Sequence, residues 1–267
     1  MRILVTGKEG QLARSLAERA RLHPWIELVT AGRPEVDLET PGSVASAISA
    51  ARPDAVVNAA AYTAVDQAED EPGRAMRINA DAAGEAADAA RAAGAPIIQV
   101  STDYVFDGSA SAPYDEAAPT AAIGAYGRSK LAGEEQVRAA NPDHLILRTA
   151  WVYSPFGRNF VRTMMGLAER TDTVRVVGDQ KGNPSSALDL ADGIILILGR
   201  WRRGDRTGMG RTYHLAGAGE ASWADFADAI FEACRSLGLP AAQVQPIATA
   251  DWPTKAVRPA NSRSAGK

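Results

Sequence analysis

The N-terminal half of the chain alternates short apolar runs with amphipathic stretches, and this alternation limits the possible folds more than any other feature. Apolar runs of strand length occupy residues 2–6, 25–31, 54–61, 95–106 and 143–153. Apolar residues at helical spacing occupy 11–21, 41–53, 71–94 and a stretch that begins near residue 125. Strands that alternate with helices in this way form a parallel sheet covered on both faces. We therefore predict an α/β fold built on a doubly wound parallel sheet.

Beyond Val152 the alternation loosens. Helical patterns cover 159–170, 186–201 and 222–238, strand patterns cover 173–178 and 211–217, and 249–267 shows no clear period. Such a tail is typical of a smaller lobe that packs near the carboxyl edge of the sheet. We expect a large sheet domain over 1–150 and a smaller C-terminal lobe formed mainly by 151–267, from which some segments could return to the sheet.

Composition excludes several classes of protein. Of the 267 residues 46% are apolar, which is enough for a large core, and the net charge of −3 carries no basic stripe that would suggest a nucleic-acid partner. No apolar run is long enough to cross a bilayer or to act as a signal peptide, so we expect a cytoplasmic protein without a membrane partner. A lone cysteine, Cys234, and three scattered histidines predict no metal site.

A glycine turn follows the first predicted strand. The sequence TGKEGQLA places Gly7 and Gly10 directly before a predicted helix, and Ala13 stands where a third glycine is common. A tight turn that leaves backbone amides free at a helix N-terminus suits a phosphate group. An ordinary strand–helix turn is the alternative, but the context favours a dinucleotide site, and hence a Rossmann-type sheet.

The end of the second predicted strand bears on which dinucleotide binds. An acidic residue usually stands there to hold the ribose hydroxyls, but this chain has Arg33 in the sequence VTAGR. An arginine suits a 2′-phosphate, so we predict NADPH as the cofactor, with NADH use left open. Asp37 and Leu38 follow and are expected near the adenine, although a turn role for Asp37 is equally consistent.

The sequence YGRSK places Tyr126 and Lys130 four residues apart on a predicted helix, and therefore on one face. A nearby ammonium favours a phenolate, so Lys130 is expected to lower the pKa of Tyr126 and to hold the nicotinamide ribose. Tyr126 could then donate a proton to a carbonyl oxygen. Thr102, at the end of the fourth predicted strand, is expected at the same edge of the sheet, where its hydroxyl could polarise that carbonyl.

This combination resembles the extended short-chain dehydrogenase/reductase superfamily. Within it, the chain is similar to the dTDP-4-dehydrorhamnose reductase family in the segments GKEGQLA, NAAAYTAVDQAEDEP, STDYVFDG, YGRSKLAGE, LRTAWVY, DQKGNPS and RPANSR. The resemblance covers nearly the whole chain. It implies NADPH-dependent reduction of the 4-keto group of dTDP-6-deoxy-L-lyxo-4-hexulose to dTDP-L-rhamnose. A nucleotide-sugar epimerase or dehydratase, and a non-catalytic regulatory subunit of the same fold, are the alternatives.

The resemblance also implies roles for individual residues. Catalysis is assigned to Tyr126 as proton donor, with Lys130 and Thr102. The implied cofactor contacts add Gly10, Gln11, Leu12, Ala61, Tyr62 and Thr63. The implied substrate contacts are Val65, Thr102, Asp103, Tyr104 and Trp151. Arg258 and Arg263 are candidates for a bidentate clamp on a diphosphate, or are solvated tail residues.

The chain departs from the family in three respects. Tyr62 stands where histidine is frequent. Family members usually continue for some tens of residues after the RPANSR-like segment, whereas this chain ends at NSRSAGK. Ser15 lies where some relatives place an acidic residue that binds magnesium between subunits. We therefore predict no metal, and a monomer or weak homodimer that takes a dTDP-sugar, while the base of the nucleotide is not readable from the residues.

Overall fold

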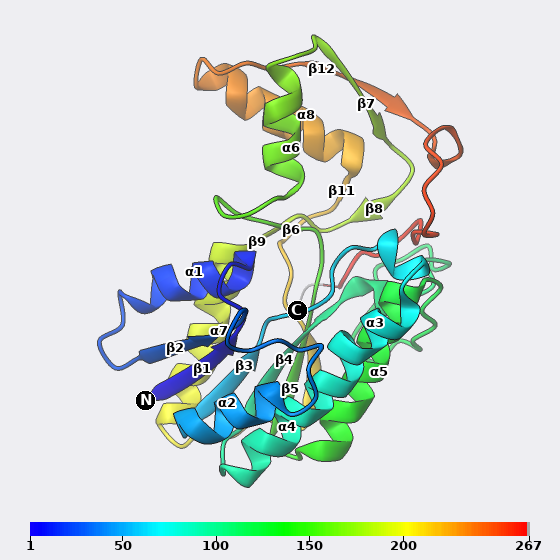
Figure 1. Ribbon diagram of the computed structural model, residues 1–267. Coiled ribbons are helices and arrows are strands. Elements are labelled where there is room, and N and C mark those ends of the chain that lie inside the picture. Colours follow the sequence, from blue (N-terminus) through cyan, green and yellow to red (C-terminus); the bar gives the residue numbers. More distant parts are fainter. Residues whose placement is uncertain (266–267) are drawn as a thin grey trace.

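The computed structural model describes residues 1–265 and has at its centre a parallel β-sheet (Figure 1). Within these residues the sheet contains six strands in the order β10-β5-β4-β3-β1-β2. Their bounds are β1 Arg2–Thr6, β2 Glu27–Ala31, β3 Ala55–Asn58, β4 Ile97–Thr102, β5 His144–Thr149 and β10 Arg211–His214. Strand order reverses at the β1–β3 boundary, where ligands bind in open α/β sheets. The predicted α/β class and doubly wound sheet are confirmed.

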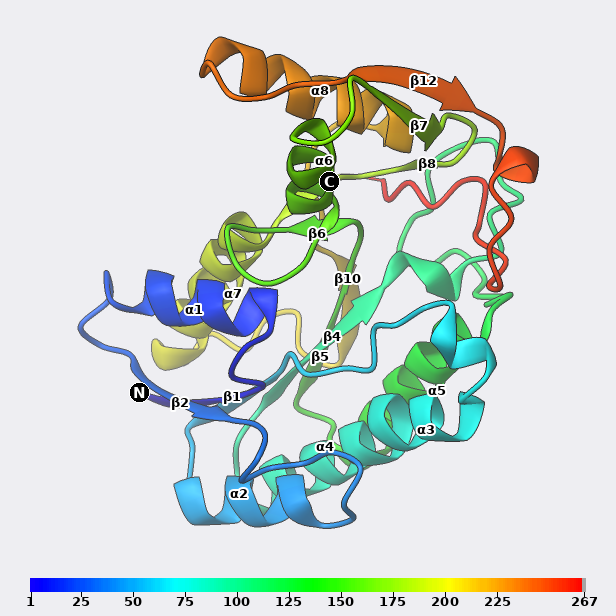
Figure 2. The same ribbon diagram turned by 45° about the horizontal axis from the view of Figure 1, so that its top comes forward.

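Helices cover both faces of the sheet, as the continuous apolar character of the strands requires. Helices α1 (Gln11–Ala20) and α7 (Ala187–Arg202) pack together on one face, and α2 (Ser43–Ala51), α4 (Ala82–Ala92) and α5 (Ala125–Ala140) cover the other (Figure 2). Each face has its own buried apolar cluster. Because α7 and β10 belong to this domain, the large domain includes chain from beyond residue 150.

The predicted long helix over 71–94 is interrupted in the structure. Helix α3 (Pro72–Met76) is followed by a π-helical turn, Arg77–Asp81, before α4 begins. The turn directs the Asn79 side chain inward, where Oδ1 accepts from Tyr62 N at 2.8 Å and Nδ2 donates to Tyr62 O at 3.0 Å and to Ser129 Oγ at 2.9 Å. These tertiary bonds explain the interruption, which the alanine-rich pattern does not reveal.

The predicted strand over 143–153 also ends early. β5 stops at Thr149, and Trp151 adopts a positive φ of 46°, which turns the chain out of the sheet. The next residues, β6 (Val152–Tyr153), pair with β9 (Ser185–Ser186) in a separate small sheet. The chain enters the lobe at this bend.

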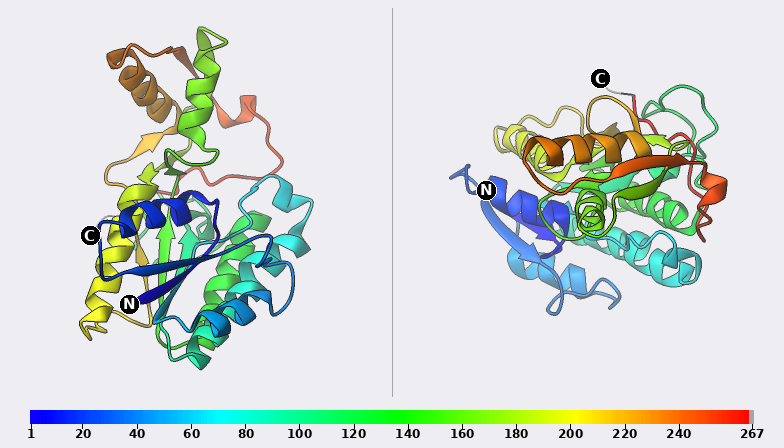
Figure 3. Two further views of the ribbon diagram at one scale, coloured as in Figure 1. Left: turned by 60° about the vertical axis from the view of Figure 1, so that its left-hand side comes forward. Right: turned by 90° about the horizontal axis from the view of Figure 1, so that it is seen from above.

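The smaller lobe lies over the carboxyl ends of the strands (Figures 1 and 3). It is formed by α6 (Phe160–Ala168), β7 (Thr173–Val177), β8 (Lys181–Gly182), β11 (Ala221–Ser222), α8 (Trp223–Ser236) and β12 (Gln243–Ile247). These elements enclose an apolar cluster of their own. None of the helices within 1–265 is long and apolar enough to span a membrane.

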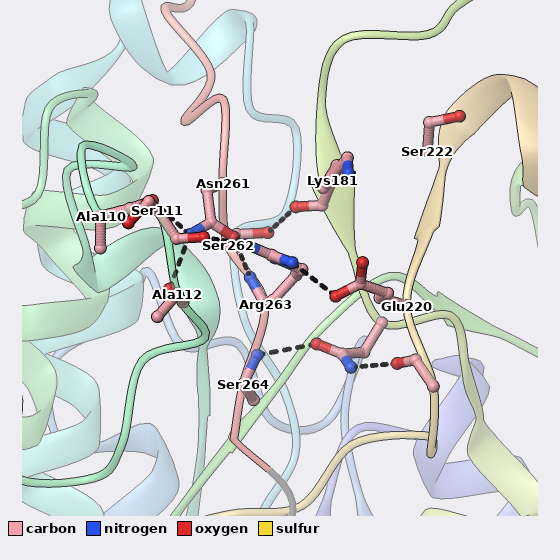
Figure 4. A network of polar contacts seen from close by, with 12 residues as sticks. Ala110, Ser111, Ala112, Lys181, Glu220, Ser222, Asn261, Ser262, Arg263 and Ser264 are labelled. Carbon is pink, nitrogen blue, oxygen red and sulfur yellow. Dashed lines mark hydrogen bonds and ion pairs between the residues drawn. The ribbon is translucent and has the colours of Figure 1, made fainter.

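The segment 256–265 runs between the lobe and the large domain and binds both (Figure 4). Asn261 Nδ2 donates to carbonyl oxygens of the loop 110–112 at 2.6 and 2.9 Å. Arg263 donates to the carboxylate of Glu220 in the lobe at 2.5 Å and to another carbonyl of the same loop at 2.5 Å. Because its guanidinium is engaged on two sides, Arg263 joins the two parts of the molecule instead of presenting a free diphosphate clamp.

Candidate active site

A cleft of about 760 Å³ opens at the carboxyl edge of the sheet, between the glycine turn and the start of α5. Strand ends, the turn before α1 and the segment after β2 form its walls. The residues that the sequence predicted as cofactor contacts all line it: Gly7, Gly10, Gln11, Leu12, Arg33, Asp37, Leu38, Ala61, Tyr62, Thr63, Tyr126 and Lys130. These residues come from four separate segments of the chain that meet at one cavity.

The glycine turn has the geometry that a phosphate group needs. Gly7 has φ of 95°, a conformation that side chains disfavour, and its amide donates to Ala31 O at 2.6 Å. Gly10 is the N-cap of α1 and has no side-chain cap, the first turn carries no acidic residue, and open space surrounds the position of a Cβ. Amides at such a helix N-terminus are free to bind an anion, so the turn fits a dinucleotide diphosphate.

Cations gather at the far end of the cleft, beside the segment after β2. Exposed Arg33 lines this end together with Lys8, which pairs with Glu35, and Arg74, which pairs with Glu39 at 2.7 Å. Lys8 and Arg74 were not singled out in the sequence, and only their place at the cleft reveals them. Asp37 accepts from the amide two residues on at 3.0 Å, so it has the turn role and also lines the cleft.

The start of α5 is fixed by a carboxylate from a distant segment. Glu69, in the 3-10 helix η1 (Gln67–Glu69), accepts from the amide of Ala125 at 2.7 Å. It therefore caps the helix that carries Tyr126, which is a stabilising arrangement at a helix N-terminus. In addition, Gly127 lies directly against the carbonyl oxygen of Tyr104, in the 3-10 helix η3 (Asp103–Val105).

Tyr126 and Lys130 line the cleft, and the Thr102 hydroxyl at the end of β4 is hydrogen-bonded to Tyr126. Desolvation raises the pKa of Tyr126 to about 12, and a hydrogen bond with the Thr102 hydroxyl opposes this rise. The Lys130 ammonium is 4% exposed, and Nζ donates to Val100 O at 2.7 Å. Burial lowers the pKa of Lys130 to about 8, against the opposing charge of Glu134.

The pKa of Tyr126 therefore differs from the sequence expectation. We expected Lys130 to lower this pKa, but the net shift is upward because removal of the phenol from water dominates. The ammonium of Lys130 is directed at a strand carbonyl instead of at the phenol. At neutral pH the phenol is thus fully protonated, which is the state that a proton donor requires.

Three of the predicted substrate contacts cluster beside Tyr126. Thr102 Oγ1 donates to Asp103 Oδ1 at 3.0 Å, and the Tyr104 ring lies edge-on to the Tyr126 ring at 5.7 Å. Burial raises the pKa of Asp103 to about 6, although hydrogen bonds from Ser262 and Thr102 oppose the shift. The end of β4 and the segment after it therefore place hydroxyl, carboxyl and phenol groups next to Tyr126.

The other predicted substrate contacts lie further apart. Arg258 donates to the carboxylate of Asp66 at 3.1 and 2.6 Å and also interacts with Tyr104. Trp151 stacks on Trp223 in the lobe, with ring centroids 3.6 Å apart. Val65 is partly buried in the loop after β3. The structure therefore joins Arg258 to the Tyr104 side of the site and stacks Trp151 on a residue of the lobe, whereas Val65 precedes Asp66, the partner of Arg258.

The glycine turn, the Tyr–x–x–x–Lys helix and the sheet order define an α/β dinucleotide-binding fold of the short-chain dehydrogenase/reductase type. The sequence profile described as RmlD substrate binding domain matches residues 1–266. A dTDP-4-dehydrorhamnose reductase of Sinorhizobium fredii is 48% identical, and the match covers 98% of this chain and 88% of that protein. The chain belongs to the dTDP-4-dehydrorhamnose reductase family.

Solved structures agree with this assignment. The dTDP-4-dehydrorhamnose reductase of Bacillus anthracis, determined in complex with NADP, has a TM-score of 0.91 at 34% identity, and the match covers 100% of this chain and 90% of that one. The corresponding protein of Clostridium acetobutylicum has a TM-score of 0.90 at 38% identity, with 99% and 90% of the two chains covered. The resemblance inferred from the sequence segments is confirmed.

Proposed function

We propose that this chain reduces the 4-keto group of dTDP-6-deoxy-L-lyxo-4-hexulose with NADPH and thereby forms dTDP-L-rhamnose. The observation that carries the proposal is that Tyr126 and Lys130 line a cleft that contains every predicted cofactor contact, while the Thr102 hydroxyl is hydrogen-bonded to Tyr126. The names of the relatives and the NADP bound to the Bacillus anthracis protein support the choice of substrate and cofactor.

The residues of the cleft fit this cofactor. The free amides of the glycine turn would hold the diphosphate. Arg33 and Lys8 would hold the 2′-phosphate, since cations surround that end of the cleft and the end of β2 carries no acidic residue. Lys130 would hold the nicotinamide ribose. When bound, the nicotinamide supplies a hydride to the carbonyl carbon of the sugar.

Side chains of the protein supply the proton that the reduced carbonyl oxygen takes up. Tyr126 donates its phenolic proton to the carbonyl oxygen, and the Thr102 hydroxyl hydrogen-bonds at the same centre. The phenolate that results then regains a proton from solvent. Because the pKa of Tyr126 is about 12 before reaction, the phenolate is short-lived at neutral pH.

The sugar nucleotide would lie between this centre and the lobe. We assign substrate contacts to Asp103, Tyr104, Trp151, Val65 and Arg258. The division into a cofactor domain, 1–150, and a lobe for the substrate, mainly 151–267, is part of the same proposal. We further expect a monomer or weak homodimer that works in the cytoplasm.

The test is an assay with purified protein, the 4-keto sugar nucleotide and NADPH or NADH. Oxidation of NADPH, measured as loss of its absorbance, should accompany reduction of the sugar, and the product should be dTDP-L-rhamnose. Tyr126→Phe should lower turnover by about 10²–10⁴-fold and leave NADPH affinity within about twofold. As a control, Tyr213→Phe removes a phenolic hydroxyl from β10, outside the cleft, and should change neither.

Other outcomes would contradict the reduction. Sugar conversion without net NADPH consumption would indicate an epimerase or dehydratase that recycles its cofactor. No turnover, together with stoichiometric capture of a partner enzyme, would indicate a regulatory subunit. Full activity of Tyr126→Phe would remove the proton-donor role.

A further inference from the structure

A completely buried carboxylate, Glu134 on α5, has no part in the mechanism above. Its Oε1 accepts from Ser101 Oγ at 2.6 Å and from Arg148 Nε at 2.9 Å. Its Oε2 accepts from Nη2 of Arg148 and from Nη2 of Arg138, each at 2.8 Å. A buried charge with this many partners is costly to break, because loss of one partner leaves the others uncompensated.

Glu134 extends the row of side chains that perform the chemistry. Tyr126, Lys130 and Glu134 are four residues apart, so they lie on one face of α5. Lys130 binds the carbonyl of Val100, and Glu134 binds the hydroxyl of Ser101. Two consecutive residues of β4, immediately before Thr102, are therefore both tied to α5.

The carboxylate also reaches the next strand. Arg148 on β5 is the register partner of Ser101 on β4, so Glu134 binds both members of one cross-strand pair. The following pair contains Thr102. Glu134 on α5 is thus bonded to both β4 and β5. These bonds lie one residue before Thr102, whose hydroxyl is hydrogen-bonded to Tyr126.

The charge of Glu134 also couples it to Lys130. The bonds from Arg148, Ser101 and Arg138 outweigh desolvation and lower the pKa of Glu134, so it is ionised. Its negative charge raises the pKa of Lys130 against burial. The elements packed against α5 carry further charged or titratable groups, among them Asp103 and Tyr104 on η3, Arg77 on the π-helical turn and Arg148 on β5, but Glu134 is the charge that shifts the pKa of Lys130.

We propose that Glu134 is a positioning residue for the reaction: it holds α5 in register with the end of β4, so that Tyr126 and Lys130 meet Thr102. This inference rests on the proposed function for its kinetic consequence. Loss of the carboxylate removes the bonds that tie α5 to Ser101 and Arg148, while the bond from Lys130 to Val100 remains. It also removes the negative charge nearest to the Lys130 ammonium along the helix.

The experiment compares Glu134→Gln with Glu135→Gln. Glu135 is exposed on the same helix, so its variant has the same chemical change without the buried bonds. Glu134→Gln should lower kcat about 10–100-fold, and the basic limb of its pH profile should move to lower pH by about one unit. NADPH affinity, measured by fluorescence as a function of pH, should decline as pH rises, and in the variant this decline should begin at a lower pH than in the unaltered protein. Glu135→Gln should match the unaltered protein in all three.

Two results would overturn the inference. One is a kcat within twofold of the unaltered protein. The other is a kcat loss that only follows a lower melting temperature, with both pH profiles unmoved. If Glu134→Gln fails to fold, Ser101→Ala takes its place, because it removes a single bond to the same carboxylate. It should lower kcat about 3–10-fold, and an unchanged kcat would refute the inference. If the unaltered protein does not reduce the sugar, the proposed function fails, while NADPH affinity against pH still tests Glu134.

Discussion

Gly127→Ala tests whether the contact between α5 and η3 sets the geometry of the proton donor. A Cβ added at this position would lie 2.3 Å from the carbonyl oxygen of Tyr104, whereas ordinary contact begins at 3.4 Å. The obstacle is backbone, so it cannot rotate away. The helix must therefore move from η3 by about 1 Å, and Tyr126 is the residue next to the substitution.

The size of the effect follows from this displacement. A 1 Å error in the position of a reacting group costs about 100-fold in rate. Overpacking costs about 1–3 kcal/mol of stability, and the higher helix propensity of alanine returns about 1 kcal/mol. We therefore expect a folded variant with a kcat lower by about 100-fold.

The assay is NADPH oxidation with the 4-keto sugar nucleotide, accompanied by urea denaturation. Gly166→Ala is the matched control, because this glycine also lies in a helix, α6, and has no atom near the position of a Cβ. It should raise stability by about 0.5–1 kcal/mol and leave kcat unchanged. A Gly127→Ala protein with unaltered stability and kcat would refute the reasoning.

Two further predictions concern the cofactor and a buried acid. Arg33→Ala should raise the KM for NADPH about tenfold and leave that for NADH unchanged, and equal effects on both would contradict a 2′-phosphate contact. Asp103 has a folded pKa of about 6, above its ordinary 3.8, so its ionisation destabilises the protein as pH rises through this interval. Asp103→Asn should therefore be more stable at pH 8 by up to about 3 kcal/mol in urea denaturation, and the gain should fade between pH 6 and 4. A gain that does not depend on pH would show that ionisation is not the cause.

Tertiary contacts account for the elements that the sequence patterns missed. The pattern over 71–94 is rich in alanine and predicts one helix, but Asn79 bonds to Tyr62 and Ser129, which lie in other segments, from within the π-helical turn. The run over 143–153 has the pattern of one continuous strand, but the bend at Trp151, whose ring stacks on Trp223, ends that strand early. Local periodicity carries no information about such partners.

The electrostatics of the candidate site depended on the fold in the same way. Helical spacing placed Tyr126 and Lys130 on one face of α5, but only burial shows that the pKa of the phenol rises. Glu134 and Glu135 are adjacent and chemically identical, and the sheet decides that one is buried against Arg148 while the other faces water.

The sequence by itself determined the order of most strands and helices and the position of the glycine turn, because these follow from short-range periodicity and from the meeting of parallel strand ends at one edge. Several of the cofactor contacts were implied by the family resemblance, and Lys8 and Arg74 became visible only in the folded cleft. The three-dimensional packing alone decided which charges are paired, such as Arg258 with Asp66, and which acidic groups lie in the interior. Ionisation and ion pairing depend on the dielectric surroundings and on groups distant in the chain, and both exist only once the chain has folded.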